Sequence, residues 1–191
     1  MPFGYFLEFR DRTMISAGLK DLFVQLQKEF DPTHITGEYL AAGSEYRTQF
    51  GFIDYASDNR KLLKWNAMVA KGGFYNGDFN YFEGRMSYRY QPYASLSVNF
   101  TYTDLLLPDP FERTQLILVG PKLDLTFTDK LFLSTFVQYN EQMDNVNLNM
   151  RFQWRYQPVS DLFVVYTDNY FPGTWNSRNR ALVFKLTYWL N

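Results

Sequence analysis

Two carboxylates, Glu83 and Asp124, are the residues whose types first suggest catalysis. Glycoside hydrolysis uses two carboxyl groups that flank the bond to be broken, one of them protonated. Arginine or lysine residues accompany both side chains along the sequence. A nearby cation keeps a carboxyl group ionised, which opposes the role of a general acid. An enzyme with an unrecognised site is therefore the last of three function classes that the sequence leaves open.

Side chains for metal or nucleophilic chemistry are scarce. The chain has no cysteine and a single histidine, His34. This excludes disulfides, thiolate nucleophiles and the usual Cys/His metal sites. His34 follows Asp31-Pro32-Thr33, a probable turn, so we expect an exposed loop residue. The sequence predicts no catalytic residue, no metal and no cofactor.

Charged residues recur on one side of the predicted strands. Inside a barrel they would face the lumen, where mixed charges pair as structural filling or select solutes. We expect the structural role for most of them. The candidate lumen-facing residues are Glu83, Arg85, Arg89, Lys122, Asp124, Arg151, Arg155 and Lys185.

The elements that position these residues have a period of two. In the clearest example, Leu148, Met150, Phe152 and Trp154 alternate with Asn149, Arg151, Gln153 and Arg155. Such alternation predicts strands with one apolar and one polar face. Residues 11–30 are the least clear, because Ala17–Leu22 could also form a turn or a short helix. We expect about eleven strands, near 3–10, 22–30, 44–54, 63–70, 82–90, 96–103, 115–127, 131–140, 146–156, 161–168 and 181–190.

Strand length and loop length favour a membrane barrel. The strands are about 10–13 residues long, and a tilted strand needs about 9–11 residues to cross a bilayer. Tight turns alternate with longer connections, as in outer-membrane barrels. Aromatic residues make up 20% of the chain and stand at strand ends, where an interfacial girdle is expected. The candidate girdle residues are Tyr88, Tyr90, Trp154, Tyr156 and Tyr188.

These features predict an all-β fold, an antiparallel up-and-down transmembrane β-barrel of the outer-membrane type, in one domain spanning residues 1–191. It would have about 10–12 strands or be the C-terminal part of a larger barrel. A soluble ligand-binding barrel has the same period with its faces exchanged and is the second function class. The net charge of -1 gives no reason to expect a nucleic-acid partner.

The ends of the sequence bear on completeness. Residues 1–6 lack the basic and apolar regions of a signal peptide. With Asn191 periplasmic, about eleven strands leave Met1 outside, whereas single-chain barrels of this type have an even strand number. We expect either a further strand within 11–21 or a truncated barrel, which would fold poorly by itself.

Several segments carry a family resemblance. They are Gly72–Gly77, Val137–Asn140, Trp154–Tyr166 and Arg180–Tyr188, and Arg155-Tyr156-Gln157-Pro158-Val159-Ser160-Asp161-Leu162-Phe163 is the most specific. Over residues 35–190 the chain resembles the C-terminal region of the DUF5916 family of Bacteroidetes-type Gram-negative bacteria. The resemblance implies a barrel that follows a carbohydrate-binding family 9-like domain. We therefore expect an outer-membrane anchor or pore, with membrane lipid as partner and a glycan bound through an upstream domain.

Overall fold

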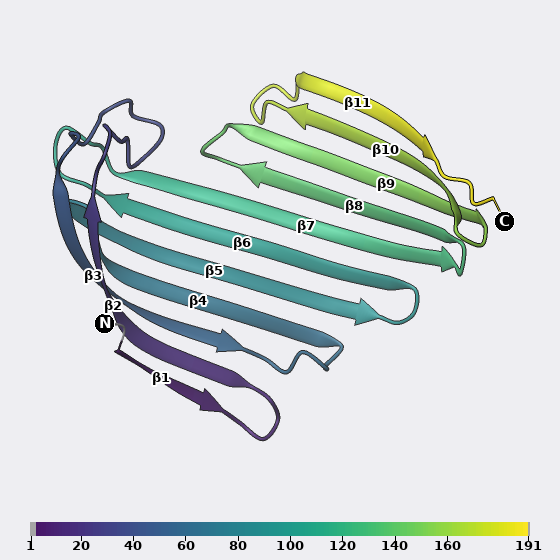
Figure 1. Ribbon diagram of the computed structural model, residues 1–191, viewed down its shortest axis with the longest axis horizontal. Helices are drawn as coiled ribbons and strands as arrows, with labels where there is room; N and C mark the ends of the chain where they lie inside the picture. The colour runs from purple at the N-terminus through teal and green to yellow at the C-terminus, as the bar shows by residue number, and fades with distance from the viewer. Residues whose placement is uncertain (1–2, 191) are drawn as a thin grey trace. The chain divides into compact units, whose positions relative to one another are not determined.

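The computed structural model describes residues 3–190, which form one antiparallel sheet (Figure 1). Neighbouring strands follow one another in chain order, an up-and-down topology. No helix within residues 3–190 has the length and apolarity to cross a membrane. The strands are β1 (Phe3–Glu8), β2 (Met14–Gln25), β3 (Glu45–Ala56), β4 (Leu63–Phe74), β5 (Gly77–Tyr90), β6 (Ala94–Leu106), β7 (Thr114–Thr128), β8 (Leu131–Asn140), β9 (Asn145–Gln157), β10 (Ser160–Tyr170) and β11 (Ser177–Leu186).

The all-β, antiparallel, up-and-down prediction is confirmed, and so is the count of about eleven strands. Except for β1, the strands have 10 to 15 residues, about twice the usual length in soluble proteins. Closure into a barrel is not observed within residues 3–190, because β1 and β11 stand at the two ends of the strand order. The expected sides of Met1 and Asn191 fall outside the described residues.

The prediction for residues 11–30 was wrong in its boundaries. The stretch Ala17–Leu22, for which a turn or a short helix had been left open, lies inside β2, and no separate strand covers 22–30. Gly18 pairs with Gly4 of β1, and a Cβ on Gly18 would stand 2.5 Å from the carbonyl oxygen of Phe3. Glycine is thus needed because two strands approach closely here, a reason that local sequence does not reveal.

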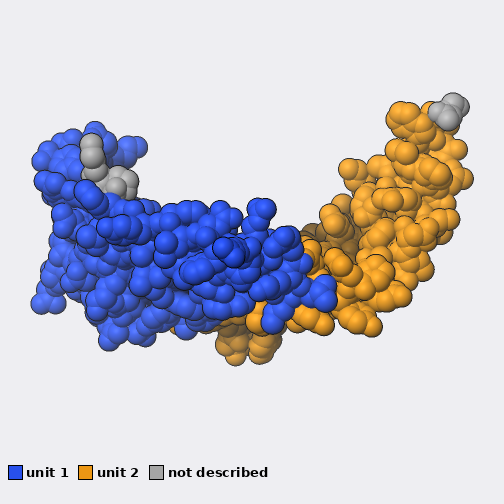
Figure 2. Space-filling view, turned by 90° about the horizontal axis from the view of Figure 1, so that it is seen from below, with its two compact units in different colours: residues 1–85, 100–117 blue, residues 86–99, 118–191 orange. Residues whose placement is uncertain are grey.

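The strands divide between two compact units (Figure 2). Unit 1 comprises residues 1–85 and 100–117, and unit 2 comprises residues 86–99 and 118–191. Each of β5, β6 and β7 contributes residues to both units.

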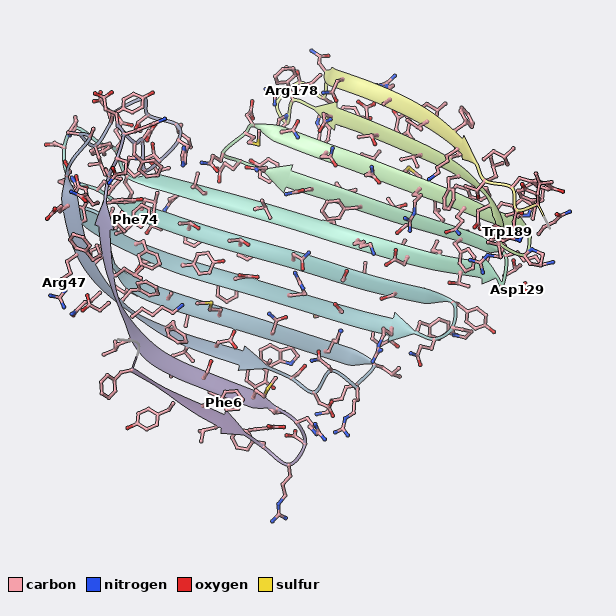
Figure 3. All side chains as sticks on the ribbon, in the orientation of Figure 1. Phe6, Arg47, Phe74, Asp129, Arg178 and Trp189 are labelled. Carbon is pink, nitrogen blue, oxygen red and sulfur yellow. The ribbon has the colours of Figure 1, made fainter. Side chains whose placement is uncertain are left out.

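Unit 1 holds the largest group of buried apolar side chains. Residues 26–44, here called the capping loop, connect β2 to β3. Leu26 and Leu40 of this loop are buried against Leu107 and Phe111, which follow β6. Val24, Tyr46 and Phe74, from the ends of β2, β3 and β4, pack on the same cluster (Figure 3). The core of unit 1 therefore lies at one end of its strands.

Candidate functional site

Strands β7 to β11 carry a shared polar face in unit 2. Asp124 pairs with Ser134, and Ser134 pairs with Arg151. Arg155 pairs with Asp161, and Phe163 on the same face pairs with Lys185. Directly paired residues point to the same side of a sheet. Five of the eight candidate lumen-facing residues thus share what we call the polar face of unit 2: Lys122, Asp124, Arg151, Arg155 and Lys185.

Both carboxylates of this face are neutralised by neighbours. Lys122 Nζ lies 2.7 Å from Asp124 Oδ2, and the Ser134 hydroxyl also donates to the Asp124 carboxylate. Arg155 Nε lies 3.5 Å from Asp161 Oδ1, which also accepts a hydrogen bond from Gln153. Each carboxylate is thus paired with a cation and accepts a hydrogen bond from a further neighbour. These contacts fit the predicted structural filling better than acid–base catalysis.

Amides extend the polar face toward the β8–β9 connection. Asn145 and Asn147 both donate to the Asn169 side-chain oxygen, at 3.2 and 2.8 Å. Asn149 donates to the Thr167 hydroxyl at 2.9 Å. Asn149 was expected on the polar side of its strand, but none of the three asparagines was among the candidate lumen-facing residues, although asparagine recurs at every second position from 145 to 149. They join the polar side chains of β9 and β10 into one hydrogen-bonded surface.

The remaining candidate lumen-facing residues lie on β5. Glu83, Arg85 and Arg89 occupy alternate positions there and therefore share one face. The Tyr81 hydroxyl donates to Glu83 Oε2 at 2.8 Å. Glu83 belongs to unit 1 and Asp124 to unit 2, and each accepts a hydrogen bond from a hydroxyl group nearby. Each of the two carboxylates is thus held by hydrogen bonds within its own unit.

The opposite face of unit 2 is apolar across five strands. Leu125 of β7 pairs with Leu133, which pairs with Phe152 of β9. Phe152 pairs with Val164, and Val164 pairs with Phe184 of β11. Phe184 is 66% exposed. Large uncovered apolar surfaces are rare on soluble proteins and mark contacts with a partner or a membrane. We call this surface the apolar face of unit 2.

One buried acid interrupts the apolar face. Asp168 pairs with Leu148 and is 0% exposed. It accepts hydrogen bonds from the Tyr166 and Ser177 hydroxyls, each at 2.6 Å, and from Arg180 Nε at 2.7 Å. The sequence analysis missed this cluster, because Asp168 ends a weakly alternating strand. These three donors satisfy the hydrogen-bonding capacity of the buried Asp168 carboxylate, near the β10–β11 connection.

The candidate girdle residues lie at strand ends beside the tight connections. Tyr88 and Tyr90 precede the β5–β6 turn, and Trp154 and Tyr156 precede the β9–β10 turn. The Tyr156 hydroxyl donates to the carbonyl oxygen of Thr187, beside Tyr188. Tyr88, Tyr90, Trp154 and Tyr188 are between 46% and 59% exposed. Amphipathic rings with this exposure suit a boundary between apolar and aqueous surroundings.

In unit 1, the same strand end carries an aromatic pair that the girdle prediction did not include. Tyr55 and Trp65 stack with their ring centroids 4.1 Å apart. The pairing register places Ala17 of β2, Ile53 of β3 and Val69 of β4 on the same face of the sheet as this aromatic pair. We call this surface the apolar face of unit 1. It includes Ala67, at the alternate position between Trp65 and Val69 on β4.

The capping loop meets unit 1 on the opposite face. Val24 and Tyr46 are paired and share the face of Phe50, which pairs with Gly72. Phe74 comes two residues after Gly72 on β4, so its side chain points to this face too. The loop core is therefore on the side of unit 1 opposite its apolar face.

A hydrogen-bonded turn around Asp31 organises this loop. Burial raises the pKa of the Asp31 carboxyl, but hydrogen bonds from the Thr33 hydroxyl and from backbone N–H groups outweigh it, and the pKa lies below its usual range. The donors include the backbone N–H groups of Thr33 at 2.8 Å and of Gly37 at 3.0 Å. His34 is exposed, as predicted, with its ring edge against Phe30.

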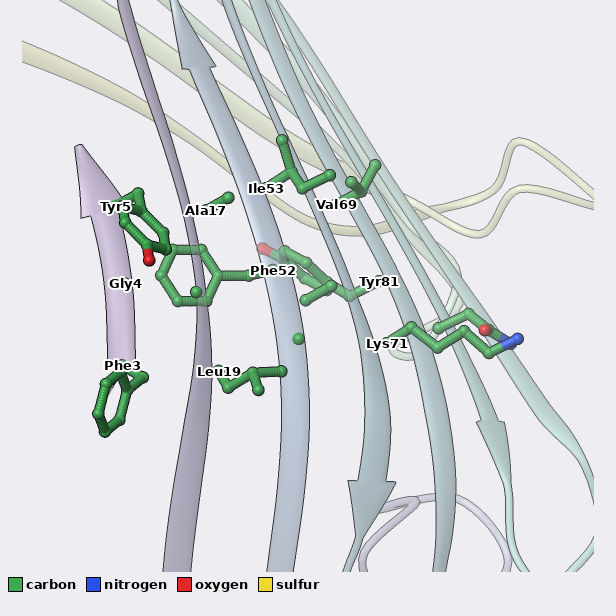
Figure 4. Close-up of a pocket in the computed structure, with 14 residues that line it drawn as sticks. Phe3, Gly4, Tyr5, Ala17, Leu19, Phe52, Ile53, Val69, Lys71 and Tyr81 are labelled. Atoms are coloured by element: carbon green, nitrogen blue, oxygen red, sulfur yellow. The ribbon is translucent and has the colours of Figure 1, made fainter. Parts of the chain in front are cut away.

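The apolar face of unit 1 contains a groove of about 930 Å³. Ala17 and Gly51 are small residues of its lining, and Phe3, Tyr5 and Leu19 are among the larger ones (Figure 4). Its lining is almost entirely apolar, with Lys71 and Asn80 as exceptions. The sequence analysis did not anticipate this groove, because its residues come from five strands.

Comparison with protein-family models, with curated proteins and with solved structures gives no match to this chain.

Proposed function

We propose that this chain forms part of the wall of a transmembrane β-barrel of the outer-membrane type and serves as a membrane anchor or pore. One observation carries the proposal: the long strands present apolar faces that no other described element covers. In unit 2, for example, Leu182, Phe184 and Leu186 are each more than half exposed. In water such a face needs a second packed layer, whereas hydrocarbon would cover it in a membrane.

The ends of the strands support the same proposal. Polar and charged side chains replace apolar ones toward the capping loop, where Arg47 and Asp21 form an ion pair at 2.6 Å. Exposed aromatic side chains stand at the other end, at Trp65 in unit 1 and Trp154 in unit 2. An apolar band bounded by aromatic and polar residues is the profile of an outer-membrane barrel. The polar face would then line the interior.

Spin labels on β9 provide the test. Single labels at 148, 150, 152 and at 149, 151, 153 would be compared in lipid vesicles for collisions with oxygen and with a water-soluble relaxation agent. We expect the even positions to be accessible to oxygen and the odd positions to the soluble agent. Water access on the even positions would contradict the proposal and favour the alternative of a soluble ligand-binding barrel.

An outer-membrane location and a glycan-related role for a larger protein are further parts of this proposal. They depend on the resemblance to the DUF5916 family and stay predictions. Mass-spectrometric detection of the chain in isolated outer membranes would test the location. Glycan-array binding by the native protein, compared with residues 1–191 alone, would test whether the glycan contact lies outside this chain.

A further inference from the structure

We infer that the groove on the apolar face of unit 1 holds one acyl chain of a membrane phospholipid, whose anionic phosphate pairs with Lys71. This inference rests on the proposed membrane location. It adds a specific lipid site to a surface that would otherwise be a uniform contact with the bilayer.

The shape of the groove follows from the pairing register. Leu19 pairs with Gly51, and Gly51 pairs with Lys71. Two residues along each strand, Ala17 of β2 pairs with Ile53 of β3. The adjacent strands β2 and β3 therefore each contribute one small residue to this part of the face, Ala17 and Gly51. Tyr5 of β1 and Val69 of β4 lie to either side and are 84% and 44% exposed. A depression bordered by larger apolar side chains matches a hydrocarbon chain better than a polar ligand.

Lys71 supplies the charge at one end of the groove. Within residues 3–190, Lys71 forms no ion pair, in contrast to Arg47 on the same face, which is paired with Asp21. A lysine with its stem on apolar surface can extend its ammonium group to the headgroup level. Basic side chains at that level attract anionic phosphates. An apolar groove that ends at an unpaired cation thus complements an anionic amphiphile, and a free phosphate would contact Lys71 alone.

Two substitutions separate the apolar and the charged parts of the site. A Cβ on Gly51 would make only ordinary contacts, with Leu19 Cδ2 at 3.4 Å and the carbonyl oxygen of Gly18 at 3.9 Å. Gly51→Leu should therefore fill the groove without backbone strain. Lys71→Glu reverses the charge at its end. Lys64→Glu is the matched control, because Lys64 lies on the same strand as Lys71 but points to the opposite face of the sheet.

Native mass spectrometry of the full chain, released from vesicles of phosphatidylcholine and phosphatidylglycerol, measures retained lipid. We expect one retained phosphatidylglycerol in preference to phosphatidylcholine. Lys71→Glu should lower that preference about fivefold, the value of one surface cation, and Gly51→Leu should reduce retention of both lipids. Lys64→Glu should leave both unchanged, and added inorganic phosphate should not displace the lipid.

The outcomes distinguish the site from the proposed function. If the chain does not insert into vesicles, the proposed membrane function fails. If it inserts but both variants retain lipid as the native chain does, the groove is not a lipid site. Displacement by inorganic phosphate, or an equal effect of Lys64→Glu, would also overturn the inference.

Discussion

Arginine at position 150 tests the assignment of the two faces of β9. Met150 lies midway between Val146 and Trp154 in the apolar row of that strand. The row covers about eight residue steps of about 3.3 Å, or about 26 Å along the strand. At a tilt of about 40° this is about 20 Å across the bilayer, which places Met150 near the midplane. We expect Met150→Arg to lower the free energy of unfolding by about 2–4 kcal/mol.

Equilibrium unfolding by guanidinium in lipid vesicles, followed by tryptophan fluorescence, measures this effect. Val146→Arg, near the end of the row, should cost only about 0–1 kcal/mol. Asn149→Arg places the same charge on the polar face and should cost only about 1 kcal/mol, because it removes the hydrogen bond from Asn149 to Thr167. The reasoning is refuted if Asn149→Arg costs as much as Met150→Arg, or if the cost does not depend on depth.

Three further predictions follow from the described contacts. Asp31→Ala should leave several buried donors unpaired and destabilise the capping loop by about 1–3 kcal/mol, measured as faster hydrogen exchange there. Because folding lowers the pKa of Asp31 below 3.8, the native loop should keep this stabilisation above that pH and lose it as the pH falls further. Protection factors of the loop amides that stay constant as the pH falls would contradict this. Asp168→Ala should destabilise unit 2 by about 1–3 kcal/mol by removing the acceptor of Arg180, and an unchanged midpoint of unfolding would argue against a structural cluster. The purified chain should not hydrolyse chromogenic glycosides or peptides, and turnover abolished by Glu83→Gln or Asp124→Asn in a folded variant would reverse our ranking of enzymes as last.

Local patterns in the sequence predicted most of the strands and both faces of β9. Alternation is a property of consecutive residues, and side chains in a strand must point to opposite sides. For that reason Arg151 and Arg155 could be placed on the side opposite Met150 before any pairing was known. The tight connections that follow Tyr90 and Gln157 have a similar local cause, since proline fixes the backbone at Pro92 and Pro158.

Contacts between distant residues decided what the sequence could not. The boundaries of β2 depend on Gly18 facing Gly4 across a close strand pair. The packing of the capping loop depends on Leu107 and Phe111, which come more than sixty residues after Leu40. Neither partner can be identified from its neighbours in the chain.

The sequence by itself determined the period, and therefore which side chains share a face within one strand. Only the tertiary structure decided the register between strands, because pairing energies sum over many cross-strand contacts whose partners are set by the whole sheet. The register joined Lys122, Asp124 and Ser134 into one hydrogen-bonded group and brought Ala17, Gly51 and Lys71 together along one groove. It also left β1 and β11 at the two ends of the strand order. Closure into a barrel requires backbone hydrogen bonds between the two edge strands, and the alternation of residues within one strand does not specify such pairing.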